Sequence, residues 1–223
     1  MAIKHLIFDF DGVITQNAPW VTYRLFCKCL KAYGYELTID ECFDRFFGMT
    51  IRNTVKLLND TCDPKRHDII PSSFLDTFAE QFLEDLIQFG TVDQYLVSLI
   101  NHCDSVSICS SSLRGHITHF LSAKGLMSYF PLERLFTYES VEHHKPAPDI
   151  YQKCLRDLQL DSADVCVIED STSGVQSAIA AGLPVYGYIA GTPSYLRDNH
   201  RAELTALGVD SVIECFSELI PDH

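Results

Sequence analysis

The chain has 223 residues, of which 47% are hydrophobic and 21% charged, which excludes a disordered chain and fits one large domain or a domain with a smaller insert. Its 17 basic and 30 acidic side chains give a formal net charge of −13. This balance argues against nucleic acid or an anionic membrane as the main partner, because both require clustered Lys and Arg.

The sequence contains no apolar run of the ~18 residues that a membrane-spanning helix needs, and its N-terminus lacks the pattern of a signal peptide. Nine scattered cysteines without metal-binding spacing are expected to be reduced thiols, mostly in the core. We therefore expect a cytoplasmic protein, either a monomer or a weak homodimer.

The first predicted element is a buried strand in "KHLIFDF" (4–10), a short aromatic and β-branched run. Residues 17–100 then show helical periodicity and no convincing strand. Helices are expected at 22–34, 38–48, 50–60 and 72–90. This block predicts a small helical bundle inserted after the first strand.

From residue 105 onward, predicted strands alternate with single helices. The strands are 105–110, 134–139, 164–170 and 183–189, and the helices are 114–125, 148–160 and 173–182. Such alternation indicates right-handed crossovers and a parallel sheet. The predicted fold class is therefore α/β, with a parallel-sheet core formed by residues 1–16 and 101–223 and a helical-bundle domain formed by residues 17–100.

Acidic residues follow two of these strands. Asp9 and Asp11 come at the end of the first, and Glu169 and Asp170 at the end of another. Ligands of open α/β sheets bind at the carboxyl ends of strands. A cluster of carboxylates there needs a cation, and oxygen ligands indicate Mg²⁺. The alternatives are that "DFDG" is only a turn and that Asp170 or Ser171 is only a helix cap.

Two further segments could hold an anion. The run "CSSS" (109–112) lies between a strand and a helix, so Ser110 and free amides would face a helix N-terminus. Lys145 lies in a loop stiffened by Pro146 and Pro148. The alternatives are helix capping and a solvated lysine. A carboxylate nucleophile, a hydroxyl, a lysine and metal-binding acids are together what phosphoryl transfer requires.

Four motifs in this order resemble those of the haloacid dehalogenase-like hydrolase superfamily. They are "DFDGV" (9–13), Ser110 after "VSIC", Lys145 in "KPAPDIY", and "IEDSTSGVQSAIAAG" (168–182). The resemblance covers essentially the whole chain. It is to the subgroup with a helical cap inserted after the first strand, which includes β-phosphoglucomutase and sugar-phosphate phosphatases.

The resemblance implies a Rossmann-like core, a mobile cap and a Mg²⁺ cofactor. By it, Asp9 is the nucleophile and a metal ligand. Asp11 is the general acid and base and lends its backbone carbonyl to the metal. Asp170, helped by Glu169, completes the metal site.

For the substrate, the resemblance implies that Ser110 and Lys145 bind the transferring phosphoryl group and that Ser111 adds a backbone amide. In the segment "GMTIRNTV" (48–55), Arg52 stands near where substrate phosphates bind in relatives. The alternative for Arg52 is an ordinary solvated helix position.

The leading hypothesis is a Mg²⁺-dependent phosphatase that hydrolyses a small phosphorylated metabolite, such as a sugar phosphate, through an aspartyl-phosphate. A β-phosphoglucomutase-like phosphomutase is the alternative, although the histidine that such mutases carry is missing from the segment "APWVTY". Separately, Gln16 and Asn17 stand where many relatives have an Asp and a Ser. A haloalkanoate dehalogenase would not need Asp11, and a phosphonate hydrolase would need a lysine such as Lys56. A non-catalytic phosphometabolite-binding protein is the remaining alternative.

Overall fold

The computed structural model of the protein describes residues 4–221, which divide into two compact units. The sheet unit runs up to Asn17 and resumes at Thr91, and the helical unit is Ala18–Gly90. The sequence predicts the second boundary at residue 100. In the structure, residues 91–100 belong to the sheet unit, because the Gln16 N–H donates to the Thr91 carbonyl and a helix at Leu96–Asn101 packs against that unit.

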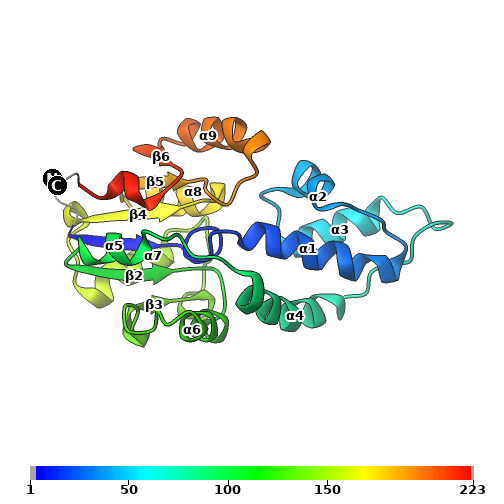
Figure 1. The fold of residues 1–223 in the computed structure, drawn as a ribbon, viewed down its shortest axis with the longest axis horizontal. Coiled ribbons are helices and arrows are strands. Elements are labelled where there is room, and N and C mark those ends of the chain that lie inside the picture. The colour runs from blue at the N-terminus through cyan, green and yellow to red at the C-terminus, as the bar shows by residue number, and fades with distance from the viewer. Residues whose placement is uncertain (1–3, 222–223) are drawn as a thin grey trace. The chain divides into compact units, whose positions relative to one another are not determined.

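The sheet unit is built on a parallel sheet with strand order β3-β2-β1-β4-β5-β6 (Figure 1). The strands are β1 His5–Phe8, β2 Ser105–Cys109, β3 Leu135–Phe136, β4 Val165–Glu169, β5 Val185–Tyr188 and β6 Ser211–Ile213. The central strand β1 is completely buried, as its apolar sequence predicts. The chain order reverses on either side of β1, between β2 and β4, which is where open α/β sheets bind ligands.

Helices cover both faces of this sheet. They are α5 Leu96–Asn101, α6 Arg114–Ala123, α7 Asp149–Leu158, α8 Thr172–Ala180 and α9 Arg197–Ala206. Ile7 of β1 belongs to the core formed with α7, α8 and α9. Its neighbour Phe8 points to the opposite face, where it makes edge-to-face contacts with Phe130 and Phe216. The parallel α/β core predicted from the sequence is confirmed.

The helical unit contains four helices, α1 Ala18–Leu30, α2 Ile39–Phe46, α3 Ile51–Asp60 and α4 Phe74–Phe89. Helix α1 packs against α2 and α4. Thr38 begins α2 with a capping box, in which its hydroxyl accepts from the Glu41 amide and its own amide donates to the Glu41 carboxylate. Phe26 and Phe78 form part of the aromatic core between α1 and α4.

Some elements differ from the sequence prediction. Helix α1 begins at Ala18, four residues earlier than predicted, because Pro19 is tolerated in a first helical turn. Strand β3 has two residues and a 3₁₀ turn follows it. The sequence did not predict α5, α9 or β6. Helix α5 and strand β6 are too short for a periodic signal, and helix α9 is mostly polar.

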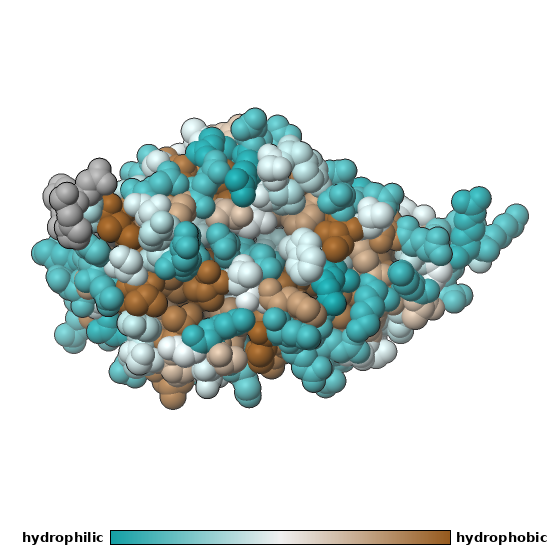
Figure 2. All heavy atoms as spheres, in the orientation of Figure 1, coloured by the Kyte–Doolittle hydropathy of each residue, from teal (hydrophilic) through white to brown (hydrophobic). Residues whose placement is uncertain are grey.

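The face in Figure 2 is largely hydrophilic, with hydrophobic residues in separate patches, as expected of a chain whose large apolar side chains lie inside. Within residues 4–221, no helix combines the length and the apolar character needed to cross a membrane. All nine cysteines are free thiols, and five of them are buried.

Candidate active site

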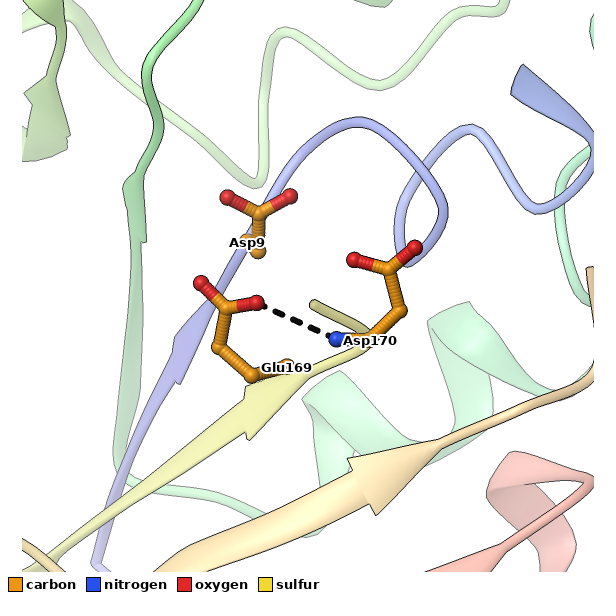
Figure 3. Close-up of side chains that lie close together, drawn as sticks. All are labelled: Asp9, Glu169 and Asp170. Carbon is orange, nitrogen blue, oxygen red and sulfur yellow. Dashed lines mark hydrogen bonds between the residues drawn. The ribbon is translucent and has the colours of Figure 1, made fainter. Parts of the chain in front are cut away.

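Strands β1 and β4 deliver the first acidic residues to one edge of the sheet. They pair in parallel with Phe8 opposite Ile168, so Asp9 and Glu169 follow at the same level. The Asp9 amide donates to the Ile168 carbonyl at 3.0 Å. Figure 3 shows the carboxylates of Asp9, Glu169 and Asp170 gathered at this edge, and one oxygen of each lies within 4.8 Å of the others.

Lys145 places a buried ammonium among these carboxylates. Its Nζ donates to Asp9 Oδ1 at 2.6 Å, to Glu169 Oε1 at 2.5 Å and to the Cys109 carbonyl at 2.9 Å. Its side chain is only 4% exposed. Burial alone disfavours the ammonium, but the charges of Asp9 and Glu169 outweigh burial and raise the pKa of Lys145 well above its ordinary value. The buried position of Lys145 between two carboxylates favours its ammonium form, and the solvated-lysine alternative is wrong.

Glu169 is fully buried, and hydrogen-bond donors surround both of its oxygens. Oε1 accepts from Lys145 and, at 2.9 Å, from the Tyr151 hydroxyl. Oε2 accepts from the amides of Asp170 and Ser171 and from the Ser171 hydroxyl. These contacts fix the position of the Glu169 carboxylate, and through it the position of Lys145.

Ser171 is the N-cap of α8, since its hydroxyl accepts from the Gly174 amide at 3.1 Å. The capping role suggested by "EDS" thus belongs to Ser171, and the Asp170 side chain is left for the acidic cluster. Burial, and then the charges of Asp9 and Glu169, raise the pKa of Asp170. The imidazole of His200 lies 2.8 Å from the Asp170 carbonyl oxygen.

Gly12 lets the loop after β1 approach the acidic cluster. Its φ is +93°, and an added Cβ would lie 1.8 Å from Asp170 Oδ2. Only glycine satisfies both the left-handed backbone and this close approach. The turn predicted from "DFDG" is present and also brings the loop against Asp170.

Asp11 lies in the same loop but makes different contacts. Its carboxylate accepts a short hydrogen bond from the Ser112 hydroxyl and a longer one, at 3.4 Å, from the Thr15 hydroxyl. Burial raises the pKa of Asp11, and these two hydroxyls partly oppose that effect. Its carboxylate is not part of the cluster formed by Asp9, Glu169 and Asp170.

The serine run after β2 lies at the same edge of the sheet. Ser110 is buried, and its hydroxyl accepts from the Ser112 amide at 3.1 Å, whereas Ser111 is exposed. Helix α6 begins after Leu113 without a side-chain cap. The alternative that the serines only cap α6 is therefore wrong.

The acidic residues of this site fit a hard divalent cation. Burial raises the pKa of Asp9 to about 8, and the charge of Glu169 adds to that effect against the opposing influence of Lys145. Such raised values mean that ionised carboxylates are costly here unless a cation compensates them. Since every nearby carboxylate offers only oxygen, Asp9, Glu169 and Asp170 suit Mg²⁺.

The structure brings six of the predicted residues to this edge of the sheet unit, namely Asp9, Asp11, Ser110, Lys145, Glu169 and Asp170. Arg52 is an exposed residue of α3 in the helical unit, and its role stays a prediction. Lys56 is also exposed and pairs with Asp60 at 2.6 Å, which raises its pKa. A Schiff-base lysine needs a lowered pKa, so the phosphonate-hydrolase alternative loses its candidate.

Sequence reasoning missed the residues that hold this site in place, Thr15, Ser112, Tyr151 and His200. Ser112 and Tyr151 stand inside the quoted segments "CSSS" and "KPAPDIY", but nothing in their spacing indicates a carboxylate partner. The contact of Ser112 with Asp11 spans 101 positions.

The parallel sheet and its buried carboxylate–lysine site define an α/β enzyme with its functional groups at the carboxyl edge. The profile of the haloacid dehalogenase-like hydrolases matches residues 6–188. The chain belongs to this family, which confirms the resemblance found in the sequence.

The chain is similar to several known proteins. It is 27% identical over 188 residues to the chloroplastic protein SUPPRESSOR OF QUENCHING 1 of Arabidopsis thaliana, covering 81% of this chain but only 17% of that protein. It is 27% identical over 187 residues to fructose-1-phosphate phosphatase of Escherichia coli K12, and the match covers 80% of this chain and 92% of that phosphatase. A crystal structure of a conserved haloacid dehalogenase-like protein of unknown function from Agrobacterium tumefaciens superposes on this structure with a TM-score of 0.82 at 25% sequence identity. The superposition covers 97% of this chain and 95% of that one.

Proposed function

We propose that this enzyme is a Mg²⁺-dependent phosphatase that hydrolyses a small phosphorylated metabolite through an aspartyl-phosphate. The observation that carries this proposal is the contact of Lys145 Nζ with Asp9 Oδ1 at 2.6 Å, beside Glu169 and Asp170. A nucleophilic carboxylate, a fixed cation and a metal-binding pair are adjacent there, as phosphoryl transfer requires.

Asp9 attacks phosphorus, and the bond to the leaving oxygen breaks as the acyl-phosphate forms. Lys145, which no longer needs to neutralise the Asp9 carboxylate, donates to an oxygen of the transferring group. Ser110 and the amide of Ser111 bind its remaining oxygens. Asp9, Asp170 and Glu169, together with the Asp11 carbonyl, would hold Mg²⁺, which would supply positive charge to the phosphoryl oxygens when bound.

Asp11 moves the proton. Its raised pKa favours the protonated form that donates to the leaving oxygen, and the resulting carboxylate then accepts a proton from the water that attacks the acyl-phosphate. The hydroxyls of Ser112 and Thr15 keep its carboxyl group oriented. This division of labour accounts for two aspartates two residues apart.

We assign the substrate to the sugar phosphates, since a relative covered over 92% of its length is a fructose-1-phosphate phosphatase. The helical unit serves as the cap that closes over the substrate, and Arg52 contributes a positive charge to its binding. The absence of the mutase histidine favours the phosphatase over the phosphomutase.

The test is phosphate release from a panel of hexose and pentose phosphates and from p-nitrophenyl phosphate, with Mg²⁺ or a chelator. Activity is expected only with Mg²⁺ and is expected to disappear in Asp9→Asn. The matched control is Asp157→Asn, which removes the same charge from a surface pair with Lys153 on α7. Activity that survives in Asp9→Asn would refute the mechanism. An isomeric sugar phosphate without free phosphate would identify a phosphomutase.

A further inference from the structure

Two cysteines of the helical unit lie in direct contact. Cys27 on α1 and Cys42 on α2 have their Sγ atoms 3.4 Å apart, with one thiol hydrogen-bonded to the other. They are 15 positions apart in sequence, and the packing of α1 against α2 brings them together. A disulfide requires a sulfur separation of about 2.0 Å, so a small movement of the two side chains would allow a bond between Cys27 and Cys42.

The two thiols differ in access. Cys42 is fully buried, whereas Cys27 is 7% exposed and lines a surface groove of about 350 Å³. Arg24 and Lys28 of α1 and Lys31, which follows the helix directly, line the same groove. Reactive thiols occupy electropositive, partly accessible environments of this kind, because positive charge stabilises the thiolate.

Their acidities also differ. The hydrogen bond between the two thiols lowers the pKa of Cys27 against the effect of burial, and the smaller influences of the charges of Glu41 and Lys31 oppose each other. The same hydrogen bond, followed by burial, raises the pKa of Cys42. Cys27 is thus the more acidic and more accessible thiol of the pair.

We propose that Cys27 and Cys42 form a redox modification site, in which a peroxide admitted through the basic groove oxidises Cys27 and Cys42 then closes a disulfide between α1 and α2. In the first step, the Cys27 thiolate attacks one peroxide oxygen, the O–O bond breaks, and Cys27 sulfenic acid and hydroxide form. In the second, Cys42 sulfur attacks the Cys27 sulfur, and the hydroxyl leaves as water with the Cys42 proton. Two thiols and one hydrogen peroxide give one disulfide and two waters.

Cys29 provides an internal comparison on the same helix. Its thiol contacts Gln81 Oε1 at 3.7 Å, and burial raises its pKa. It has neither a sulfur partner nor a lowered pKa, so peroxide is expected to oxidise Cys27 first. The site does not depend on the proposed phosphatase activity, because none of its residues belongs to the sheet unit.

The experiment treats the full-length protein with hydrogen peroxide, alkylates the remaining thiols and maps the peptides without reduction. Wild type and Cys29→Ser are expected to lose two hydrogen masses and to yield a Cys27–Cys42 linked peptide that dithiothreitol cleaves. In Cys42→Ser, dimedone is expected to label Cys27, since nothing resolves its sulfenic acid. In Cys27→Ser, both the link and the label are expected to be lost.

The wild-type map decides the question even if a variant fails to fold. A linked peptide that forms only after the protein has been unfolded would overturn the proposal. So would oxidation of Cys29 at the rate of Cys27, or a link between the sheet-unit thiols Cys109 and Cys154 in place of the proposed one.

Discussion

The position of the Glu169 carboxylate depends on the absence of a side chain at Gly174, the third residue of α8. A Cβ built at Gly174 would lie 1.8 Å from Glu169 Oε1, and real Cβ atoms essentially never come closer than 3.0 Å to such an atom. In Gly174→Ala, the carboxylate and the helix must therefore separate by more than an ångström. Oε1 accepts from Lys145 at 2.5 Å and from Tyr151 at 2.9 Å, and a shift of that size breaks at least one of these bonds.

The magnitude follows from three contributions. Losing one hydrogen bond to a charged group costs about 1.5–3 kcal/mol. Overpacking a buried site costs about 1–3 kcal/mol. Replacing glycine by alanine within a helix returns about 1 kcal/mol. Gly174→Ala is therefore expected to lower the free energy of unfolding by about 1.5–5 kcal/mol, and to reduce the activity because Lys145 loses its anchor.

Gly115→Ala is the matched control. Gly115 is the second residue of α6, and a Cβ there would meet nothing within 4 Å. Its substitution is expected to stabilise the protein by about 0.5–1 kcal/mol. Urea unfolding of both variants and the wild type measures the change in the free energy of unfolding, provided that its slope against urea concentration is the same in all three. If Gly174→Ala gained stability as Gly115→Ala does, Glu169 would not be fixed as described.

Three further predictions concern the hydrogen bonds and charges of the sheet unit. Tyr151→Phe removes the hydroxyl that donates to Glu169, and urea unfolding is expected to show a loss of about 1.5–3 kcal/mol. Asn17→Ala removes the oxygen that accepts from the Thr91 amide at 2.7 Å, so hydrogen exchange of that amide should accelerate, whereas Asn17→Asp should keep its protection. Burial raises the pKa of Asp9 to about 8, so between about pH 4 and 8 the folded metal-free protein holds protons that the unfolded chain has released, and its stability should fall as pH rises. Mg²⁺ should therefore raise the thermal midpoint more at pH 8 than at pH 5, and an equal gain at both would contradict this reasoning.

The sequence was sufficient to predict those site residues that both carry an acidic side chain and stand at the end of a predicted strand. Asp9 and Glu169 each end a buried apolar run, and two such runs in one parallel sheet must finish at the same edge. The start of the helix expected at 38–48 was likewise predictable, because a cap such as Thr38 and its helix are local in sequence.

The supporting contacts were not predictable, because they join residues far apart in the chain. Tyr151 belongs to a helix whose periodicity indicates only that this residue is buried, yet its hydroxyl donates a hydrogen bond to Glu169. The end of the helical unit was predicted ten residues late for a related reason. Leu96–Asn101 is a helix like those before it, and only its packing assigns it to the sheet unit.

The charges of the site explain why its parts depend on one another. Asp9, Asp11, Glu169 and Asp170 would carry four negative charges if all were ionised, and Lys145 offsets one of them. The remaining three would repel a phosphate ester within an already acidic protein of net charge −13. A divalent cation leaves one negative charge, and the proton that the raised pKa of Asp11 favours removes it. In the proposed mechanism, the proton donated to the leaving group and the Mg²⁺ would thus also make the charge of the site compatible with a phosphorylated substrate.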